Sequence, residues 1–518
     1  MMATCRIRKL LKCPLFLAPL TVLICLIQKD VVADVSIRVV LADTAARHSL
    51  TGRLYIFVSQ RPSVEPRFGP DLFAPEPFFA CDVAEWQPGE TVIVDDRTDH
   101  FPVPLSELSA GRYRVQAILD HQIDAAHHAF GVGNLFSDVQ EFSFEKDPSS
   151  TCELVLDRDV KPQSLPDRKW IRPVVIESPL LSQFHGRRVN NHAVVILPAN
   201  YEQERGNRYP VIYYISGFGT QLERMALQYA GRPPVAQEGE TEFIRVLLTG
   251  QCQWGHHVYA NSANTGPRSD ALIGETIPYV DAHFRTIAAS TARFVAGHSS
   301  GGWASLWLQV NYSETFGGVW STSPDPVDFR DWQCVDLYAC PAPSLFFDAH
   351  GNRRPIIRRG DQVIHWYEDF SKMDDCLGRG GQLRSFEAVF SQRGKNGQPM
   401  RLWDRTTGKL DPMVVQQWQK YDITRIVKSR WRDRGPLLRG KIHITIGEKD
   451  NFYLEGATRL LKETLDQINA EADVQILADH DHFTFLTSDF FRQQRQQMSE
   501  VFFKCHKTVD GKEDLSQK

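Results

Sequence analysis

The serine at position 299 lies in a pattern that is typical of a catalytic nucleophile. A short apolar run from Phe294 to Ala296 leads into Gly297-His-Ser-Ser-Gly301, and a helix-like run from Trp303 to Val310 follows. A strand, a sharp turn and a helix in this order form a nucleophile elbow, which strains the serine backbone and exposes its hydroxyl. Glycine is needed at 297 and 301, because a Cβ atom at either place would collide with the neighbouring strand or helix. The pattern therefore predicts that Ser299 is a nucleophile.

A serine nucleophile needs a histidine that takes its proton and a carboxylate that orients this histidine. After a nucleophile elbow the acid and the histidine follow in that order, each past a strand of the sheet. Asp450 lies four residues after a predicted strand that ends at Ile446, and Glu448 in the intervening turn is the alternative acid. His480 and His482 both follow the last predicted strand. We predict Asp450 and His482, because His482 leaves only a short loop before the final helix, and His480 remains the alternative base.

Two backbone N–H groups must meet the oxyanion that forms when an ester carbonyl is attacked. One should belong to Ser300, the residue after the nucleophile. The other should come from the loop after an early buried strand, where Ser216-Gly-Phe-Gly219 lies. We therefore predict an oxyanion hole formed by Ser300 and Phe218.

The elements that must position these residues alternate between strands and helices from residue 173 to 506. A buried parallel strand is typically a nearly continuous apolar run, as in Tyr209–Ser216, and helices of the alternating pattern cover both faces of such a sheet. The stretch from Cys334 to Pro436 is less regular and is predicted as an insertion of helices and loops. The fold class is therefore α/β, with a doubly wound, mostly parallel sheet of the α/β-hydrolase kind. Its predicted strands are 191–198, 209–216, 243–248, 294–296, 319–322, 441–446 and 474–477, and its predicted helices are 270–284, 303–310, 454–465 and one capped by Ser488.

Residues 34–157 have a different pattern, in which about eight short runs alternate with period two and turn residues separate them. This pattern predicts an all-β sandwich of immunoglobulin-like type. Residues 158–172 contain Pro162 and Pro166 among charged residues and are predicted to be a linker. Because the predicted sandwich contains no nucleophile, base or cluster of metal ligands, we expect it only to bind or position the substrate. A chain that begins near Asp167 should then still cleave a small ester.

The first residues predict export. Met1–Lys12 is basic, Cys13–Ile27 is almost continuously apolar, and Val31-Val-Ala33 offers small residues for cleavage after Ala33. About 15 apolar residues suit a signal peptide (1–33) and are too few to span a bilayer. The protein is thus expected to be secreted or periplasmic, without a membrane span in the mature chain. Residues 507–518 are predicted to be a polar tail.

The composition excludes some partners and favours none. A net charge of −4 in 518 residues gives no basic field for nucleic acid. No Cys/His spacing resembles a zinc site, so neither a metal nor a cofactor is expected. Seven cysteines remain after the signal peptide, so at least one should be free. The adjacent His256 and His257 would point to opposite faces of a strand, which favours packing over metal binding.

Five motifs between Asn191 and Arg495 occur together in one known family: Val194-Val-Ile-Leu-Pro198, Tyr209-Pro-Val-Ile-Tyr-Tyr-Ile-Ser-Gly-Phe-Gly219, Glu275-Thr-Ile-Pro-Tyr-Val-Asp281, Gly297-His-Ser-Ser-Gly301 and Asp479-His-Asp-His-Phe483. Through them the segment resembles the putative-esterase branch of the α/β-hydrolases, which includes esterase D, antigen 85 mycolyltransferases, feruloyl esterases and enterochelin esterases. The resemblance implies Ser299, Asp450 and His482 as a triad, with Phe218 and Ser300 at the oxyanion hole. The sequence departs from the family in two places: it has His-Asp-His where the family often has Gly-Gly-His or Gly-Asp-His, and it has the insertion, which small members lack.

The predicted function is that of an exported serine esterase that forms an acyl-enzyme on Ser299. Its substrate would be a small-molecule or polysaccharide ester; export and the β-sandwich favour an esterified polysaccharide or an aromatic ester by analogy of fold. Acyl transfer to an alcohol is an alternative that uses the same intermediate. A protein that binds a glycan without catalysis is the alternative from another class, and an intact Ser, Asp, His set argues against it.

Overall fold

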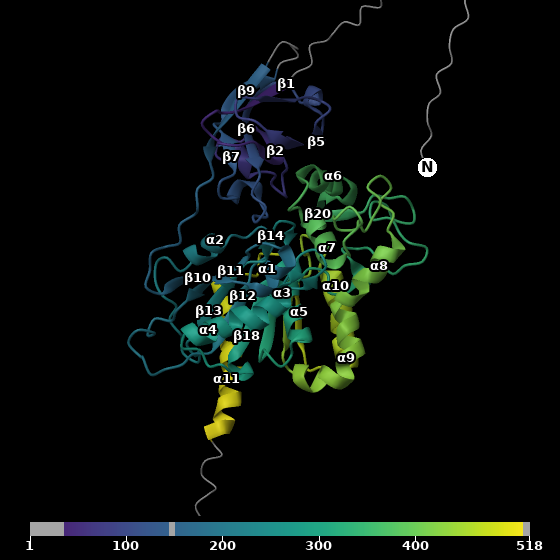
Figure 1. Ribbon diagram of the computed structural model, residues 1–518. Helices are drawn as coiled ribbons and strands as arrows, with labels where there is room; N and C mark the ends of the chain where they lie inside the picture. Colours follow the sequence, from purple (N-terminus) through teal and green to yellow (C-terminus); the bar gives the residue numbers. More distant parts are fainter. Residues whose placement is uncertain (1–35, 145–150, 511–518) are drawn as a thin grey trace, which may run out of the picture.

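The structure is a computed structural model that describes residues 36–144 and 151–510 (Figure 1). The predicted signal peptide, 1–33, lies outside the described residues, as do residues 511–518 of the predicted tail. The last helix, α11 (Ser488–Asp510), covers the first four residues of that tail. Thr487 caps this helix in place of the predicted Ser488, because its hydroxyl accepts a hydrogen bond from the Phe490 N–H at 3.2 Å.

An eight-stranded sheet forms the centre of the larger part of the molecule (Figure 1). In the spatial order from β13 to β23, neighbouring strands are parallel. The pairs β10–β11 and β11–β13 are antiparallel. This mostly parallel sheet confirms the predicted α/β fold. Its strands, in spatial order, are β10 (Ile171–Glu177), β11 (Asn190–Ile196), β13 (Ile244–Leu248), β12 (Val211–Ile215), β18 (Arg293–His298), β19 (Gly318–Thr322), β22 (Ile442–Gly447) and β23 (Asp473–Leu477).

Strand β10 begins inside the predicted linker and was not expected from the sequence. It is the edge strand of the sheet, and Pro173 lies within it. Proline lacks the N–H that a central strand needs but is tolerated at an edge, where one side of the strand pairs with no other. Because β9 (Thr151–Asp159) also runs past residue 157, strands occupy both ends of the predicted linker 158–172.

Helices cover both faces of the sheet, as expected for a doubly wound fold. Successive residues of a strand point to opposite faces. On β18, Val295 packs in the same core as Trp303 of α5 (Ser300–Asn311), whereas Phe294 packs in a separate core with Met498 of α11. The other helices around the sheet are α1 (Pro179–His185), α2 (Leu222–Leu227), α3 (Arg268–Ala271), a π-helical turn (Leu272–Thr276), α4 (Ile277–His283) and α10 (Glu455–Gln467).

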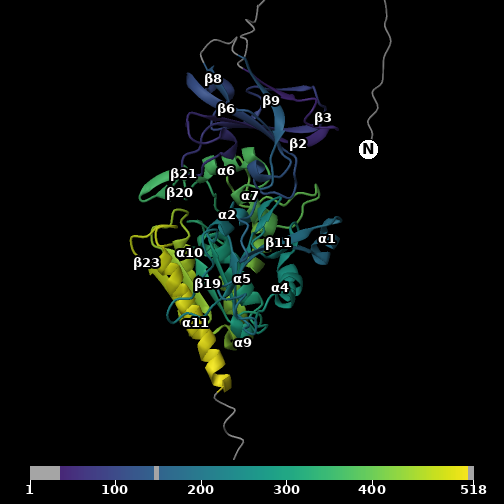
Figure 2. The same ribbon diagram turned by 90° about the vertical axis from the view of Figure 1, so that its left-hand side faces the viewer.

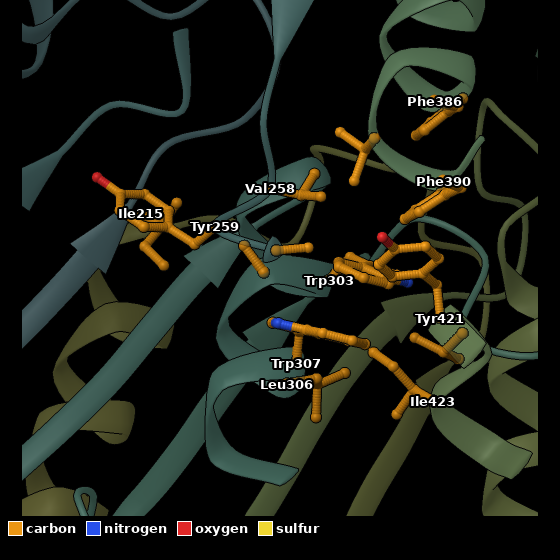
Figure 3. Packing of buried hydrophobic residues seen from close by; sticks show 14 of the residues in the cluster. Ile215, Val258, Tyr259, Trp303, Leu306, Trp307, Phe386, Phe390, Tyr421 and Ile423 are labelled. Carbon is orange, nitrogen blue, oxygen red and sulfur yellow. The ribbon is translucent and has the colours of Figure 1, made fainter. Parts of the chain in front are cut away.

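The predicted insertion, residues 334–436, packs against the helix that follows Ser299. The rings of Trp303 and Trp307 in α5 stack on each other, and Phe390 and Tyr421 of the insertion face them (Figure 3). Ring centroids lie 5.2 Å apart for Trp303–Phe390 and 5.5 Å for Trp307–Tyr421. The insertion consists of the hairpin β20 (Pro355–Arg359) and β21 (Gln362–Trp366), followed by α6 (Tyr367–Leu377), α7 (Gln382–Phe390), α8 (Pro412–Trp418) and α9, which ends past it (Ile423–Leu438).

The N-terminal part, hereafter the β domain (residues 36–144 and 151–159), is all-β in these ranges apart from short 3-10 turns, as predicted. Its hydrogen bonds join the strands in one continuous path, β4-β1-β9-β7-β6-β2-β3-β5, with β8 on β6. The two ends of the path, β4 and β5, are joined by only four residues, 95–98, so the sheet curls around a core of its own. The strands are β1 (Ser36–Leu41), β2 (Leu50–Ser59), β3 (Phe78–Trp86), β4 (Thr91–Val94), β5 (Asp99–Phe101), β6 (Gly111–Asp120), β7 (Leu135–Ser137), β8 (Gln140–Phe144) and β9.

The outer face of the β domain packs against the insertion. Successive residues of β2 pack in two different cores. Leu54 and Ile56 pack in the core of the β domain, whereas Tyr55 and Phe57 pack in the core that includes residues of α6 and α7. Helix α6 lies directly beneath the β domain in both views (Figures 1 and 2). The Tyr55 hydroxyl donates to the Leu377 carbonyl at 2.6 Å. The two parts therefore share one apolar interface, which contradicts the expectation of a β domain that is separate from the rest.

A buried ion pair and a hydrogen bond from a buried arginine to a backbone carbonyl reinforce this interface. Arg379, from the loop after α6, donates to the Asp120 carboxylate at 2.7 Å, and Asp120 is 4% exposed. Arg53 donates to the Cys376 carbonyl at 2.8 Å and to the Asp99 carboxylate at 2.7 Å. Breaking a buried pair leaves a charge without compensation, which is strongly unfavourable. The β domain is thus fixed in place on the insertion.

Candidate active site

Ser299 occupies the sharp turn between β18 and α5. Its backbone has φ 58° and ψ −123°, a conformation that costs a non-glycine residue about 1–3 kcal/mol. A Cβ atom added to Gly297 would lie 2.1 Å from the Gly301 carbonyl oxygen, and one added to Gly301 would lie 2.1 Å from that of Ile215. The predicted need for glycine at both positions is therefore confirmed. The turn has the strained geometry of a nucleophile elbow.

Asp450 and His482 form a buried pair near Ser299. The His482 Nδ1 lies 2.7 Å from the Asp450 Oδ2, and the two residues are 1% and 0% exposed. The other oxygen of Asp450 accepts a hydrogen bond from the Phe452 N–H at 2.9 Å. In this arrangement Nδ1 carries the proton, which leaves Nε2 free to accept one. A carboxylate that fixes the tautomer of a histidine is the arrangement that a serine nucleophile requires.

The two alternatives from the sequence lie elsewhere. The Nδ1 of His480 lies 3.2 Å from the Thr484 hydroxyl, within the same loop. Glu448 is exposed and pairs with Arg459 at 3.3 Å on the surface. Geometry therefore brings His482 rather than His480 to the buried acid, and Asp450 rather than Glu448 to the histidine.

The predicted oxyanion donors lie at the ends of β12 and β18. Ser300 is the first residue of α5, where an N–H group has no acceptor within the helix. Phe218 follows Gly217, whose carbonyl accepts a hydrogen bond from the Thr220 N–H, and within the described residues the Phe218 N–H donates to no backbone carbonyl. A Cβ atom on Gly217 would lie 3.3 Å from that of Ser299, which places this turn against the elbow.

Ser299, Phe218 and His482 line one cavity of about 180 Å³. Its walls are mainly apolar and come from three parts of the chain: the eight-stranded sheet, the insertion, and a loop of the β domain that carries Leu72 and Phe73. The Phe73 ring lies 5.9 Å from Phe452, whose ring lies 4.8 Å from His482. The remaining lining residues are Gly217, Thr220, His298, Asp325, Pro326, Gln333, Ile356, Ile357, Phe370, Gln382, Leu383, Phe386, Leu454 and Phe483.

Residues 188–493 match the model of a protein family described as "Putative esterase". The match covers more than half of the chain and includes Ser299, Asp450 and His482. The chain belongs to the putative esterase family. This confirms the resemblance that the sequence motifs indicated.

The chain is similar to known relatives over shorter stretches. Esterase Rv1288 of Mycobacterium tuberculosis is 32% identical over 149 residues, which are 28% of this chain and 31% of that protein. The chain thus matches about a third of the length of this relative.

Solved structures are similar at low sequence identity. A fluorophosphonate-binding serine hydrolase F (FphF) of Staphylococcus aureus is 13% identical, with a TM-score of 0.39 over 64% of this chain and 98% of its own. An S-formylglutathione hydrolase of Agrobacterium tumefaciens is 13% identical, with a TM-score of 0.38 over 64% of this chain and 95% of its own.

The sequence did not indicate the role of several residues that surround the site. In β20, Arg358 donates to the carbonyl of Asp450 at 2.8 Å and to the carboxylate of Glu455 at 2.6 Å. The side-chain oxygen of Asn451 accepts from the His482 N–H at 3.2 Å, while its amide donates to the Arg358 carbonyl at 2.9 Å. The hairpin of the insertion thus holds the loops of both the acid and the histidine. No local motif marks Arg358, because its role depends on contacts far apart in the sequence.

The adjacent histidines are buried, in agreement with the packing role that the sequence favoured over metal binding. His256 and His257 are 1% and 3% exposed, and His256 Nε2 lies 2.9 Å from the Ser216 carbonyl oxygen. Within residues 36–144 and 151–510, no group of three or more His, Cys, Asp or Glu side chains is placed to hold a metal ion. Cys81, Cys152, Cys252, Cys334, Cys340 and Cys376 are free thiols. None of the helices described in these ranges is long and apolar enough to cross a membrane.

Proposed function

We propose that this protein hydrolyses carboxylic esters, with Ser299 as nucleophile, His482 as general base and Asp450 as the acid that orients it. One observation carries the proposal: His482 is hydrogen-bonded to a buried carboxylate and lines the same apolar cavity as a strained serine. The test is the hydrolysis of p-nitrophenyl acyl esters by the purified chain without added metal or cofactor. A purified, folded chain with no turnover at any acyl length would contradict the proposal.

The proposed reaction has two halves. The Ser299 hydroxyl attacks the ester carbonyl while His482 Nε2 takes its proton, and the Ser300 and Phe218 N–H groups stabilise the oxyanion. The intermediate then collapses to an acyl-enzyme, and His482 returns the proton to the leaving alcohol. Water attacks the acyl-enzyme with His482 again as base, which releases the carboxylic acid and regenerates Ser299.

We further propose that an apolar acyl group occupies the cavity. Its walls include the aliphatic side chains of the β20 strand and six phenylalanines, Phe73, Phe218, Phe370, Phe386, Phe452 and Phe483. Burying apolar surface contributes about 25 cal/mol per Å². The preference among esters should then depend on the apolar contact area of the acyl group.

Replacing Phe73 by alanine tests whether the β domain takes part in this selection. Removing this aromatic side chain from the cavity wall should weaken the binding free energy of a long acyl group by about 1–3 kcal/mol. We therefore expect kcat/KM for a butyryl or longer ester to fall by roughly 5- to 100-fold. The acetyl ester, which is too short to use the whole wall, should change less. The matched control is Phe68→Ala, which removes a 37% exposed phenylalanine of the same domain that does not line the cavity. An equal loss for both esters, or none, would contradict a role of Phe73 in acyl selection.

Removing the β domain should do more than slow the reaction on polymers. A chain that begins at Asp167 would expose the partners of Tyr55, Phe57 and Phe78 in the shared core, and it would open one wall of the cavity. We expect this chain to aggregate or to lose most activity on small esters, because large exposed apolar patches favour association. The measurements are size-exclusion chromatography and kcat/KM on p-nitrophenyl butyrate. A monodisperse, folded truncation with unchanged kcat/KM would restore the independent β domain that the sequence suggested.

Export of the protein is part of the proposal and depends on the pattern of residues 1–33. A basic start, an apolar run of about 15 residues and small residues at 31 and 33 support cleavage after Ala33. N-terminal sequencing of the chain recovered outside the cytoplasm should begin at Asp34. An uncleaved chain that stays in the cytoplasm would contradict export.

A further inference from the structure

A second carboxylate lies in the cavity beside the nucleophile and has no part in the triad. Asp325 follows β19, is 5% exposed, and its N–H lies 3.3 Å from the Ser299 carbonyl oxygen. Within the described residues, its Oδ2 is buried and has no hydrogen-bond partner. His482 already binds Asp450 through Nδ1. Asp325 is therefore an acceptor inside the site that the proposed reaction leaves unused.

His298 presents a second unused acceptor in the same cavity. Its Nδ1 lies 3.2 Å from the hydroxyl oxygen of Thr322, and that hydroxyl gives its one hydrogen to the Gly297 carbonyl at 3.0 Å. The Thr322 oxygen must then accept, so His298 Nδ1 carries the proton and Nε2 carries none. The Nε2 atom is buried and unpaired within the described part of the chain. Burial, and then the neighbouring His482, keep the pKa of His298 well below its ordinary value, so the ring is neutral at pH 7.

Two unpaired acceptors are costly in an otherwise apolar wall. Leaving a buried polar group without a hydrogen bond costs about 1–3 kcal/mol, and more when the group is charged. Burial raises the pKa of Asp325 to about 6, although a hydrogen bond from the Ser300 hydroxyl opposes this shift. The carboxyl group is therefore mostly ionised at pH 7.5. A ligand that brings a hydrogen-bond donor to this wall would remove the cost.

We infer that the natural ester carries a hydroxyl or amino group near its reacting carbonyl, and that Asp325 Oδ2 and His298 Nε2 recognise this donor. The inference rests on the proposed esterase function and adds the substrate class: an apolar acyl ester with a hydrogen-bond donor close to the ester bond. A site built to bind such a donor discriminates against the analogue that lacks it, because its own polar groups then stay unpaired. Asp325 is thus a specificity residue of the cavity.

The test compares matched ester pairs in the wild-type chain and in Asp325→Asn. One pair differs on the alcohol side, 2-hydroxyethyl against ethyl butyrate. The other differs on the acyl side, ethyl 3-hydroxybutyrate against ethyl butyrate. At pH 7.5 the wild type should prefer the hydroxylated ester of one pair by about tenfold or more in kcat/KM, which corresponds to the cost of one unpaired buried acceptor. In Asp325→Asn this ratio should fall to within about twofold of unity, and the pair that responds identifies the side of the donor.

Two controls separate this inference from the proposed function. Glu448→Gln makes the same carboxylate-to-amide change on the surface, outside the cavity, and should keep the wild-type ratio. A fluorophosphonate probe carries no donor, so its labelling of the wild type and of Glu448→Gln, expected at rates within a few-fold of each other, tests the triad without the donor. Absence of labelling in the wild type would count against the triad and not against Asp325.

The outcomes are decisive even if the variant does not fold. A wild-type chain without preference in either pair overturns the inference by itself. A preference that persists in a folded Asp325→Asn also overturns it. If that variant fails to fold, Asp325→Glu keeps the charge but moves it by one methylene, and an unchanged ratio in this variant would count against recognition by Asp325.

Discussion

The Ser299→Ala variant is expected to fold normally and to lose esterase turnover by roughly 10⁴-fold or more. Members of a catalytic triad act as a unit, so removal of the nucleophile alone costs about as much as removal of the whole set. Alanine keeps the Cβ atom of the strained turn, and the packing of α5 against the insertion does not involve the hydroxyl. The measurement is kcat on p-nitrophenyl butyrate, together with a thermal melt of the same preparation.

Ser290→Ala is a matched control for this experiment. Ser290 lies in the 3-10 turn before β18, at the opposite end of the strand from Ser299, and does not line the cavity. Its replacement should leave kcat within about twofold, as for a surface substitution away from the site. If a folded Ser299→Ala variant kept a tenth of the wild-type rate, Ser299 could not be the nucleophile.

His482→Ala is expected to lower kcat by roughly 10⁴-fold, whereas His480→Ala should keep most of the activity. Without His482 nothing takes the proton of Ser299, and the buried Asp450 loses its partner. His480 only contacts Thr484 in its own loop. The two variants therefore form a matched pair, with the same substitution two residues apart.

The comparison of these two variants also decides between the histidines that the sequence left open. The opposite result, an inactive His480→Ala and an active His482→Ala, would move the base to His480 while the nucleophile stays unchanged. Full activity in both variants would contradict a serine hydrolase mechanism. Rates should be measured on one ester, with the folded fraction of each variant checked by its melting curve.

The core of the site was predictable because its signals are local. Gly297 and Gly301 flank the serine for a steric reason that any chain with this turn must meet, and their contacts in the structure confirm it. The strands around them are continuous apolar runs, because both faces of a parallel sheet are buried. The positions of Asp450 and His482 follow from the rule that such residues lie after strand ends. Their buried contact agrees with the prediction from order alone.

The surroundings of the site were not predictable, since they depend on contacts between distant segments. Phe73 reaches the cavity only because the β domain packs on α6. The sequence of β2 shows that both faces of this strand are apolar, but it does not show which part of the chain covers the outer face. Arg358, in β20 of the insertion, and Asp325, in the loop after β19, belong to no sequence motif. The edge strand β10 was missed because its Pro173 is typical of a linker, and proline excludes only central strands. Hydrophobic patterns of period two or 3.6 identify strands and helices, but they do not show which strands and helices pack against each other.

The most direct test of the central claim is covalent labelling of the intact chain with a fluorophosphonate, followed by peptide mass spectrometry. The account predicts one phosphonyl adduct per chain, on the peptide that contains Ser299, with complete loss of esterase activity. His482→Ala should react far more slowly, because the serine is not activated without its base. An adduct on another residue, or an enzyme that hydrolyses esters at full rate without being labelled at Ser299, would contradict the account.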